Sequence, residues 1–354
     1  MGGPVLTLGS LFDGIGVFPL AAARQGIVPL WASEIEKAPV SITRRHFPDM
    51  AHLGDITKLD GGRVPPVHIV TFGSPCQNLS QIGNRAGLCG AKSSLFYEAI
   101  RIINEMRDAT GGKFPIIAVW ENVMGAFSSS DRMDFRAVLS AFTGSQIPMP
   151  AAGRWANAGM VRGGVPDLSW RLLDAQYWAR PRLARRQRVF VVADFGGRRS
   201  AGILFKPRPV LPLPAAGGAG GLPSPCGDRG PALEARGRIP VTRPFQLFRM
   251  RGAAKDGNHV QFRDSFGFST DPFPTLLAGA LNPFAFYFED DPGSGCVRFL
   301  TERECERLMG LPEGWTAYGA EGDKISPASR YKALGNAIAL PCAEYIMAGI
   351  REAL

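Results

Sequence analysis

Over the first third of the chain, short apolar runs typical of strands alternate with stretches in which apolar residues recur at helical spacing. Five short runs are rich in apolar and β-branched residues, as expected of buried strands: VLTLGSLF, VPLWASEI, AHLGD, HIVTFGS and PIIAVWENV. After the fourth run, apolar side chains recur at helical spacing from Leu95 to Met106, and Gly111 and Gly112 follow. Strands that alternate with helices predict an α/β fold with a doubly wound, mostly parallel sheet, in which ligands bind beyond the carboxyl ends of the strands.

A second, less regular region follows. SWRLLDAQYW and RVFVVADF predict two more strands, the last ending near Phe195. From Pro207 to Gly230 the chain is rich in proline and glycine, which favours loops. The aromatic segments PFQLFRMRG and FAFYF then predict short strands of a second, smaller and irregular β-rich domain.

Two helices are predicted near the end of the chain. Thr301 and Glu304 of TERECERLMG have the spacing of a capping box, and Gly310 would end that helix. A final apolar helix, about Ala337 to Leu354, is interrupted by Pro341. We expect residues 1–195, completed by about 326–354, to form the larger domain, and residues 196–325 to form the smaller one.

The composition indicates a globular protein without a membrane span. The 354 residues exceed one average domain, and 45% hydrophobic residues are enough for a large core. No apolar stretch reaches the roughly 18 to 20 residues that a membrane span needs. The N-terminal residues lack the basic and apolar regions of an export signal. We therefore expect a cytoplasmic protein.

The charge favours a polyanionic partner. The formal net charge is +9, and the chain has eight lysines and thirty-two arginines. Arginine grips phosphate and guanine with two hydrogen bonds, although codon usage alone can also enrich it. RPRLARRQR, from Arg180 to Arg188, fits phosphate binding and a solvated charge run equally well. The six cysteines form no CxxC pair and have no neighbouring histidine, so we expect neither a zinc site nor a disulfide framework, and no metal.

A glycine-rich turn and two acids predict a nucleoside site. Gly14 and Gly16 of LFDGIG let a ligand approach the backbone where the next helix begins. Pro19 stands where the third glycine of a dinucleotide fingerprint would fall, which argues against a pyrophosphate cofactor. Glu34 and Asp55 end the second and third predicted strands, where acids suit a ribose and an adenine amino group. Each acid alone could equally cap a helix, but the combination favours a nucleoside.

Cys76 lies at the tip of the fourth predicted strand, directly after Pro75. A lone cysteine is more often a small buried hydrophobe, but at this sheet edge it is a candidate nucleophile. The polar, glycine-rich stretch after it suits a loop that closes over a ligand, and Cys89 within that stretch is incidental. Glu121 ends the fifth predicted strand at the same edge. A carboxyl beside a thiolate costs electrostatic energy unless it is protonated or paired, which favours a functional role over a helix cap or a salt bridge.

In this order, the motifs resemble those of the cytosine C5-specific DNA methyltransferases of bacteria and phages. The segments that carry the resemblance are LFDGIG, SEIEK, GDI, GSPCQNLS, WENV, RRQRVF, LTERECERLMGLPEGW and ALGNAIALP. They span Leu6 to Phe195 and Val297 to about Ile346. The resemblance implies a DNA (cytosine-5-)-methyltransferase, which transfers the methyl group of S-adenosyl-L-methionine to C5 of a cytosine flipped out of a specific duplex sequence. The product would be S-adenosyl-L-homocysteine.

The resemblance also assigns roles to residues. The cofactor site would contain residues at the strand tips and in the late GN motif: Phe12, Gly14, Gly16, Glu34, Ile35, Asp55, Ile56, Pro75 and Asn336. Cys76 would add to C6 of the cytosine, and Glu121 would bind its N3 and N4 edge. Arg186 and Arg188 would position the base and a nearby phosphate. The stretch 181–184 departs from the family pattern, which leaves Arg185 as an alternative to Arg186.

Sequence recognition belongs, by resemblance, to the smaller domain, whose variable part is about 196–296. The candidate DNA contacts are polar or basic residues and one TL dipeptide: Gln77, Ser80, Arg243, Arg249, Arg251, His259, Gln261, Arg263, Thr275 and Leu276. The expected partner is double-stranded DNA, with a cognate restriction endonuclease acting separately. A monomer is expected, with no membrane association.

Three other functions would use some of the same residues. A tRNA cytosine-5 methyltransferase would share the cysteine and the glutamate, although the large variable region favours DNA. A catalytically inactive DNA-binding homologue would not need Cys76, Glu121 and Asn336 intact. A nicotinamide-dependent oxidoreductase using Cys76 is disfavoured by Pro19 in the glycine turn.

Overall fold

The computed structural model describes residues 5–74, 94–177, 186–206, 241–248, 265–268, 276, 283–288 and 291–354. Its larger sheet has eight strands in the order β3-β2-β1-β4-β5-β8-β7-β6. The strands are β1 (Thr7–Leu11), β2 (Val28–Ser33), β3 (Ala51–His52), β4 (Ile69–Phe72), β5 (Ile117–Val123), β6 (Ala158–Val161), β7 (Asp167–Asp174) and β8 (Gln187–Asp194). All seven strands predicted for this part of the chain are confirmed, and β6 is an addition.

Strands β3, β2, β1, β4 and β5 pair in parallel, whereas β8, β7 and β6 continue the sheet in antiparallel fashion. The chain places β2 on one side of β1 and β4 on the other. The strand order therefore reverses between β1 and β4, where an open α/β sheet forms its ligand crevice. The predicted doubly wound, mostly parallel fold is confirmed.

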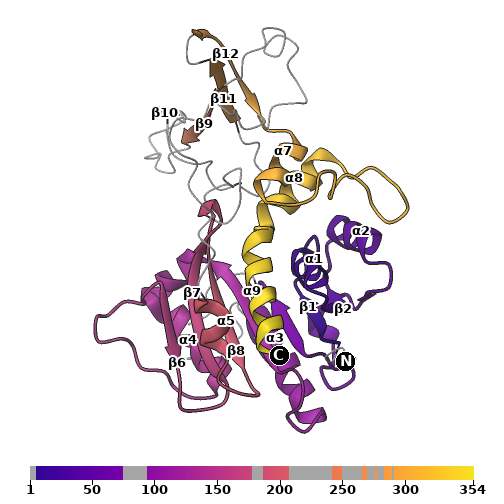
Figure 1. Ribbon diagram of the computed structural model, residues 1–354, viewed down its shortest axis with the longest axis vertical. Helices are drawn as coiled ribbons and strands as arrows, with labels where there is room; N and C mark the ends of the chain where they lie inside the picture. Colours follow the sequence, from indigo (N-terminus) through magenta and orange to yellow (C-terminus); the bar gives the residue numbers. More distant parts are fainter. Residues whose placement is uncertain are drawn as a thin grey trace, which may run out of the picture.

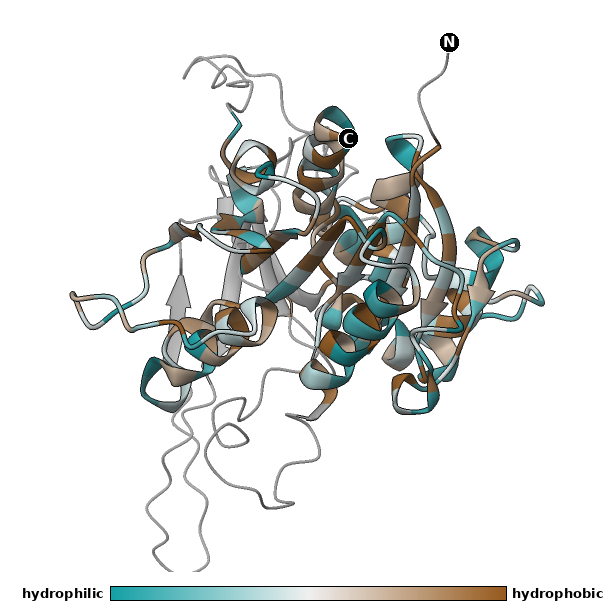
Figure 2. Ribbon diagram, turned by 90° about the horizontal axis from the view of Figure 1, so that it is seen from below, coloured by the Kyte–Doolittle hydropathy of each residue, from teal (hydrophilic) through white to brown (hydrophobic). Residues whose placement is uncertain are grey.

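Helices cover both faces of this sheet (Figure 1). One face carries α1 (Val17–Arg24), α5 (Ser200–Phe205) and α9 (Leu340–Ala353), and Figure 1 shows α9 between α1 and α5. The other face carries α3 (Ser94–Ala109) and α4 (Met133–Thr143). Successive strand residues point to opposite faces of the sheet. Leu8 and Ile69 therefore lie in the first core, beneath α1, α5 and α9, whereas Val70 and Phe72 lie in the second core, beneath α3 and α4. Figure 2 shows mainly apolar strands and helices with a polar outer side.

A four-stranded antiparallel sheet forms the upper part of the molecule in Figure 1, in the order β10-β9-β11-β12. Its strands are β9 (Val241–Phe248), β10 (Ser265–Phe268), β11 (Pro283–Phe288) and β12 (Asp291–Phe299). Strand β11 contains FAFYF, and β9 contains the first five residues of PFQLFRMRG, whose last four lie outside the described residues. The domain limits near 195 and 325 stay predictions.

The C-terminal segment contains α7 (Glu302–Leu308), α8 (Pro327–Asn336) and α9. Thr301 and Glu304 form the predicted capping box at the start of α7. The prediction of a final helix interrupted by Pro341 was wrong in detail, because α9 begins at Leu340 and Pro341 lies in its first turn. A first-turn proline needs no backbone N–H, so it starts this helix instead of breaking it.

Helix α9 closes the first core by packing against α1 near the other end of the sequence. Ile346 and Ile350 of α9 and Ala21 and Ala22 of α1 are fully buried in the same core. Within the described ranges, no single helix is long and apolar enough to cross a membrane. Only α8 and α9 taken together, with a bend of 46° between them, meet the criteria of length and composition.

Candidate active site at the carboxyl ends of the parallel strands

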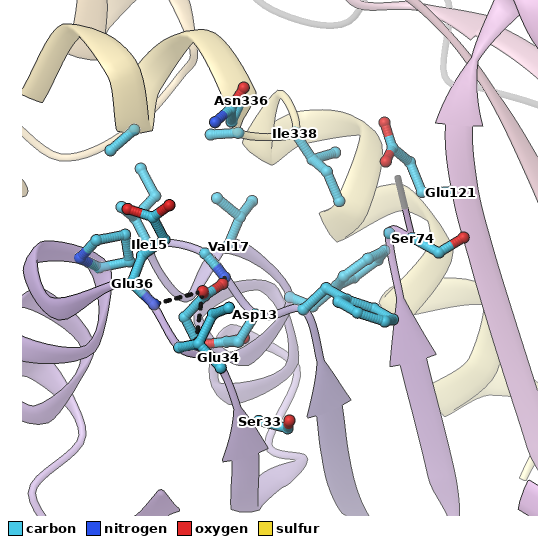
Figure 3. Close-up of a pocket in the computed structure, with 18 of the residues that line it drawn as sticks. Asp13, Ile15, Val17, Ser33, Glu34, Glu36, Ser74, Glu121, Asn336 and Ile338 are labelled. Atoms are coloured by element: carbon cyan, nitrogen blue, oxygen red, sulfur yellow. Dashed lines mark hydrogen bonds between the residues drawn. The ribbon is translucent and has the colours of Figure 1, made fainter. Parts of the chain in front are cut away.

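A cavity of about 950 Å³ opens where the tips of β1, β2, β4 and β5 meet helix α8 (Figure 3). Most of the predicted cofactor and base residues that the structure describes line it: Phe12, Gly14, Glu34, Ile35, Asp55, Ile56, Glu121, Arg188 and Asn336. Pro75, Cys76, Gln77 and Ser80 lie outside the described residues. The cavity thus combines the predicted nucleoside half with the predicted base half in one space.

The turn after β1 has a left-handed backbone at several positions. Phe12, Gly14 and Gly16 have φ of 53°, 59° and 77°. The backbone N–H of Gly14 donates to Glu34 Oε2 at 2.9 Å, which fixes the turn against the end of β2. A Cβ on Gly16 would lie 2.9 Å from Thr43 Cγ2, so this glycine lets the turn pack closely against α2 (Lys37–His46). Gly16 is not among the residues found to line the cavity in the described part of the chain.

Glu34 holds the rim of the cavity together. Its Oε1 accepts the backbone N–H groups of Ile35 and Glu36 at 2.8 and 2.9 Å. A carboxylate offers about four lone-pair positions, so these bonds and the one from Gly14 leave room for a ligand hydroxyl. The side chain of Ile35 is 72% exposed at the same rim and presents an apolar surface to a flat ring.

Asp55 is both a helix cap and a cavity residue. Its Oδ1 accepts the backbone N–H of Thr57 at 3.0 Å and the Thr57 hydroxyl at 2.8 Å, which caps the short 3-10 helix Ile56–Lys58. These hydrogen bonds, the backbone one first, lower the pKa of Asp55 and keep it ionised. The capping role considered from the sequence is therefore real, and it orients the acid at the cavity wall.

Glu121 is the buried acid at the opposite end of the cavity. It lies in the buried part of β5, which runs to Asn122, and Arg188 Nε of the neighbouring strand β8 lies 2.9 Å from its Oε1. Burial raises the pKa of Glu121 even though the arginine cation opposes the shift. Glu121 can therefore carry a proton more readily than an exposed glutamate, which is what a donor to a ring nitrogen requires.

Several site residues were not assigned from the sequence. The Asn122 side chain donates to the Ser74 carbonyl at 2.9 Å, and Trp120 Nε1 donates to the Ser74 hydroxyl at 3.1 Å. Ser74 is the last described residue before position 75, so these two bonds fix the end of β4 beside Glu121. On the far wall, Lys332 Nζ of α8 pairs with Glu36 Oε1 at 2.8 Å. WENV contained the signal for Asn122, whereas nothing in the sequence linked Glu36 to Lys332.

Asp13 also lines the cavity, but its carboxylate is buried beneath the glycine turn. In the part of the chain that the structure describes, neither carboxylate oxygen has a hydrogen-bond partner. Burial raises the pKa of Asp13 from 3.8 to about 7; the nearby Ser10 hydroxyl opposes this shift, and the negative charge of Glu34 adds to it. The acid lies within the LFDGIG motif, yet its burial is visible only in the fold.

Replacing Asp13 by asparagine should make the protein more stable at neutral pH. Between about pH 4 and about pH 7 the unfolded chain ionises this carboxyl while the folded chain keeps it protonated, so stability falls as the pH rises through this window. The amide does not titrate. The stability difference in favour of D13N should therefore grow by on the order of 1 kcal/mol per pH unit, measured by urea unfolding at several pH values. The exposed Asp49→Asn variant is the control, and parallel curves for D13N and wild type would contradict the prediction.

The other predicted residues divide into described and undescribed positions. Arg186 is 1% exposed, and its guanidinium bonds to backbone carbonyls instead of lining the cavity as far as the structure describes it. Arg243 lies in β9, opposite Ala285 of β11, and Leu276 is buried in the first core. Arg185, Arg249, Arg251, His259, Gln261, Arg263 and Thr275 lie outside the described residues. Among the described residues, no cluster of three or more histidine, cysteine or acidic side chains could hold a metal ion.

Comparisons with known proteins show the family to which the sequence is similar. The family model for C-5 cytosine-specific DNA methylase matches residues 6–146 and 285–352. A relative named DNA N-6-adenine-methyltransferase, from Escherichia phage P1, is 27% identical over 99% of this chain. The alignment covers 61% of that phage protein, so the chain spans less than two thirds of its length. Type II methyltransferase M.DsaV of Dactylococcopsis salina is 24% identical, over 93% of this chain and 81% of that protein.

A solved structure shares the fold. The S. pombe Dnmt2 methyltransferase superposes with a TM-score of 0.60, covering 98% of this chain and 99% of that one, at 16% identity.

Proposed function

Because the chain belongs to the C-5 cytosine-specific DNA methylase family, we propose that it transfers a methyl group from S-adenosylmethionine to C5 of a cytosine in duplex DNA. The observation that carries this proposal is the single cavity that joins the glycine turn, Glu34 and Asp55 to the buried pair of Glu121 and Arg188. One half suits an adenosine and the other suits a polar ring edge. A cavity of about 950 Å³ has room for both ligands at once.

The residues present fit the cofactor. The remaining acceptor position of Glu34 would accept a ribose hydroxyl, and the ionised Asp55 would accept from the adenine amino group. Ile35 would cover a face of the adenine, and Asn336 closes the cavity from the end of α8 (Figure 3). When bound, the cofactor supplies an electrophilic sulfonium methyl. The protein holds it beside the position at which the target base would meet Glu121.

The proposed chemistry on the base begins at Cys76. Its thiolate would form a bond to C6, which moves the electron pair of the 5,6 double bond to C5, where the methyl group is accepted. A proton donated or shared by Glu121 at N3 would draw electrons away from the ring and favour that addition. Loss of the C5 proton and departure of the thiolate would then restore the double bond. The base must leave the helix stack first, because C5 and C6 are inaccessible within a duplex.

The experiment that tests this function identifies the methylated base. Purified protein, radiolabelled S-adenosylmethionine and duplex DNA are incubated, and the DNA is digested to nucleosides and separated. Label in 5-methylcytosine is expected. Label in N6-methyladenine would instead agree with the name of the phage P1 relative, of which the alignment leaves more than a third unmatched. A parallel reaction contains tRNA in place of DNA. Label only in that tRNA, or in neither nucleic acid, would favour the RNA-acting or the inactive alternative.

Bisulfite sequencing of DNA from a methylation-free host that expresses the chain would give the sequence that is recognised. A separately acting restriction endonuclease, a monomeric state and a cytoplasmic location stay predictions.

Replacing Gly73 by alanine should lower kcat. A Cβ at Gly73, just after β4, would lie 3.0 Å from Glu121 Oε2, closer than most real contacts. Glu121 would have to give way by a few tenths of an ångström. Since a misplacement of about 1 Å can cost on the order of a hundredfold in rate, a loss of severalfold is expected. Methyl transfer to cytosine measures the effect. Gly202→Ala is the matched control, since a Cβ there meets nothing within 4 Å. Equal kcat values for G73A and wild type would show that Glu121 tolerates the added methyl group.

A further inference from the structure

Arg186 is one of the largest fully buried side chains among the described residues. Its Nη1 donates to the Leu276 carbonyl at 3.2 Å, and its Nη2 donates to the Gly335 carbonyl at 2.9 Å. The backbone N–H of Arg186 donates to Asp174 Oδ1 at 3.1 Å. Arg186 thus joins three parts of the described chain: the start of β8, Leu276 and the end of α8.

Burying the Arg186 cation lowers the stability of the fold. Burial, with repulsion from Arg188 as the next contribution, lowers the pKa of Arg186 to about 9. Within the described part of the chain, its guanidinium makes no direct ion pair with a carboxylate, and its Nε has no hydrogen-bond partner; the negative charge of Glu121 offsets only part of the cost of burial. Two carbonyl dipoles compensate a buried cation less well than a carboxylate would, and an apolar side chain would avoid the cost. The cost suggests that the link itself has a use.

Each linked segment leads directly to one part of the reaction. Gly335 lines the cavity next to Asn336, which belongs to the cofactor half. Leu276 is 2% exposed and anchored in the first core, and it belongs to the region between β10 and β11 of the small sheet. Two residues after Arg186, Arg188 pairs with Glu121 in the base half. The Arg186 guanidinium therefore bonds both to Leu276, in the region of the small sheet, and to Gly335, in the cofactor half, while the nearby Arg188 pairs with Glu121 in the base half.

We propose that Arg186 is a positioning residue that couples DNA binding to cofactor binding, by holding the segment of Leu276 and the end of α8 in one arrangement. This inference rests on the proposed function. DNA bound to the small sheet would fix the Leu276 segment, and the guanidinium would transmit that constraint to Gly335 and Asn336. Coupling of this kind is reciprocal, so the cofactor product should tighten DNA binding by the same factor as DNA tightens the product.

The test measures binding and needs no turnover. The dissociation constant of S-adenosylhomocysteine is determined by calorimetry, with and without a saturating DNA duplex that contains the sequence found methylated in the host. For wild type, we expect the duplex to tighten binding by at least about fivefold. Lysine offers a compact ammonium that cannot place two fixed donors on both carbonyls, so R186K should bring this factor close to one. Its affinity for S-adenosylhomocysteine without DNA should stay within about threefold of wild type.

Arg171→Lys is the matched control. Arg171 Nη1 also donates to a backbone carbonyl, that of Leu204, at 2.8 Å, but far from the cavity lining. R171K should keep the wild-type coupling factor. Leu276→Ala provides a second route, because it loosens the same anchor while Arg186 remains, and it should also lower the coupling factor.

A coupling factor of one in wild type, or an unchanged factor in R186K or L276A, would overturn the proposal. Should R186K fail to fold, the result for L276A decides alone. Failure of the proposed function would appear separately, as label in a base other than cytosine.

Discussion

Replacing Cys76 by serine should abolish methyl transfer to DNA, with a loss on the order of ten thousandfold or more in kcat, as in other covalent catalysts that lose their nucleophile. A thiol ionises far more readily than a hydroxyl, and the thiolate is the species that would add to C6 of the base. Ser74, two residues earlier and the last described residue before Cys76, lines the cavity together with Glu121 and is held by Asn122 and Trp120. Radiolabel transfer into duplex DNA measures the loss.

Two controls separate chemistry from folding in that experiment. Cys76→Ser should bind S-adenosylhomocysteine like wild type, because the residues that line the described cavity are unchanged. DNA with 5-fluorocytosine at the methylated position should trap wild type in a denaturation-resistant adduct, since fluorine cannot leave C5 as a proton, and it should not trap the variant. Substantial turnover by C76S would refute the covalent mechanism.

Replacing Glu121 by glutamine should lower kcat/KM for DNA by about a hundredfold to a thousandfold, the usual range for a lost proton donor or acceptor. The amide keeps the shape of the side chain but can neither carry the shared proton nor pair with the Arg188 cation. Because burial raises the pKa of Glu121, the protonated fraction in wild type falls as the pH rises through that pKa. Wild-type activity should decline over that window, whereas the variant should lose this dependence.

The measurement is a pH profile of kcat/KM together with DNA affinity, which should change little. Glu98→Gln removes a comparable ion pair, with Arg101 on α3 at 2.6 Å, and serves as the control. Equal profiles for E121Q and wild type would remove Glu121 from the mechanism.

The strands and their polar tips were predictable because they depend on local patterns. A buried strand, a glycine turn and an acid at the following tip are each encoded within a few residues, and a parallel sheet brings such tips to one edge. This is why Gly14, Glu34, Asp55 and Glu121 could be placed together before any coordinates existed. Asn336 was placed only through the family resemblance, since the sequence separates it widely from the other tips.

What could not be predicted depends on packing between distant segments. Trp315 Nε1 donates to the Ile15 carbonyl at 2.8 Å, and the Trp315 ring stacks on His46 at 3.6 Å between centroids. These contacts support the glycine turn from behind, but nothing near Ile15 in sequence indicates them. The burial of Arg186 has the same origin, because an arginine in a basic run gives no sign of the two carbonyls that surround it in the fold.

The packing of α9 against α1 has a consequence for the order of events during synthesis. The ribosome releases α1 and its glycine turn long before residues 340–353 exist, and until then the face of α1 that α9 covers has no cover. Arg24 of α1 also has no ion pair with Glu344 until α9 is made; in the folded chain, Arg24 Nη1 lies 2.6 Å from Glu344 Oε1. The first core should therefore close only after residues 340–353 have emerged from the ribosome, so the glycine turn should lack its final support until then.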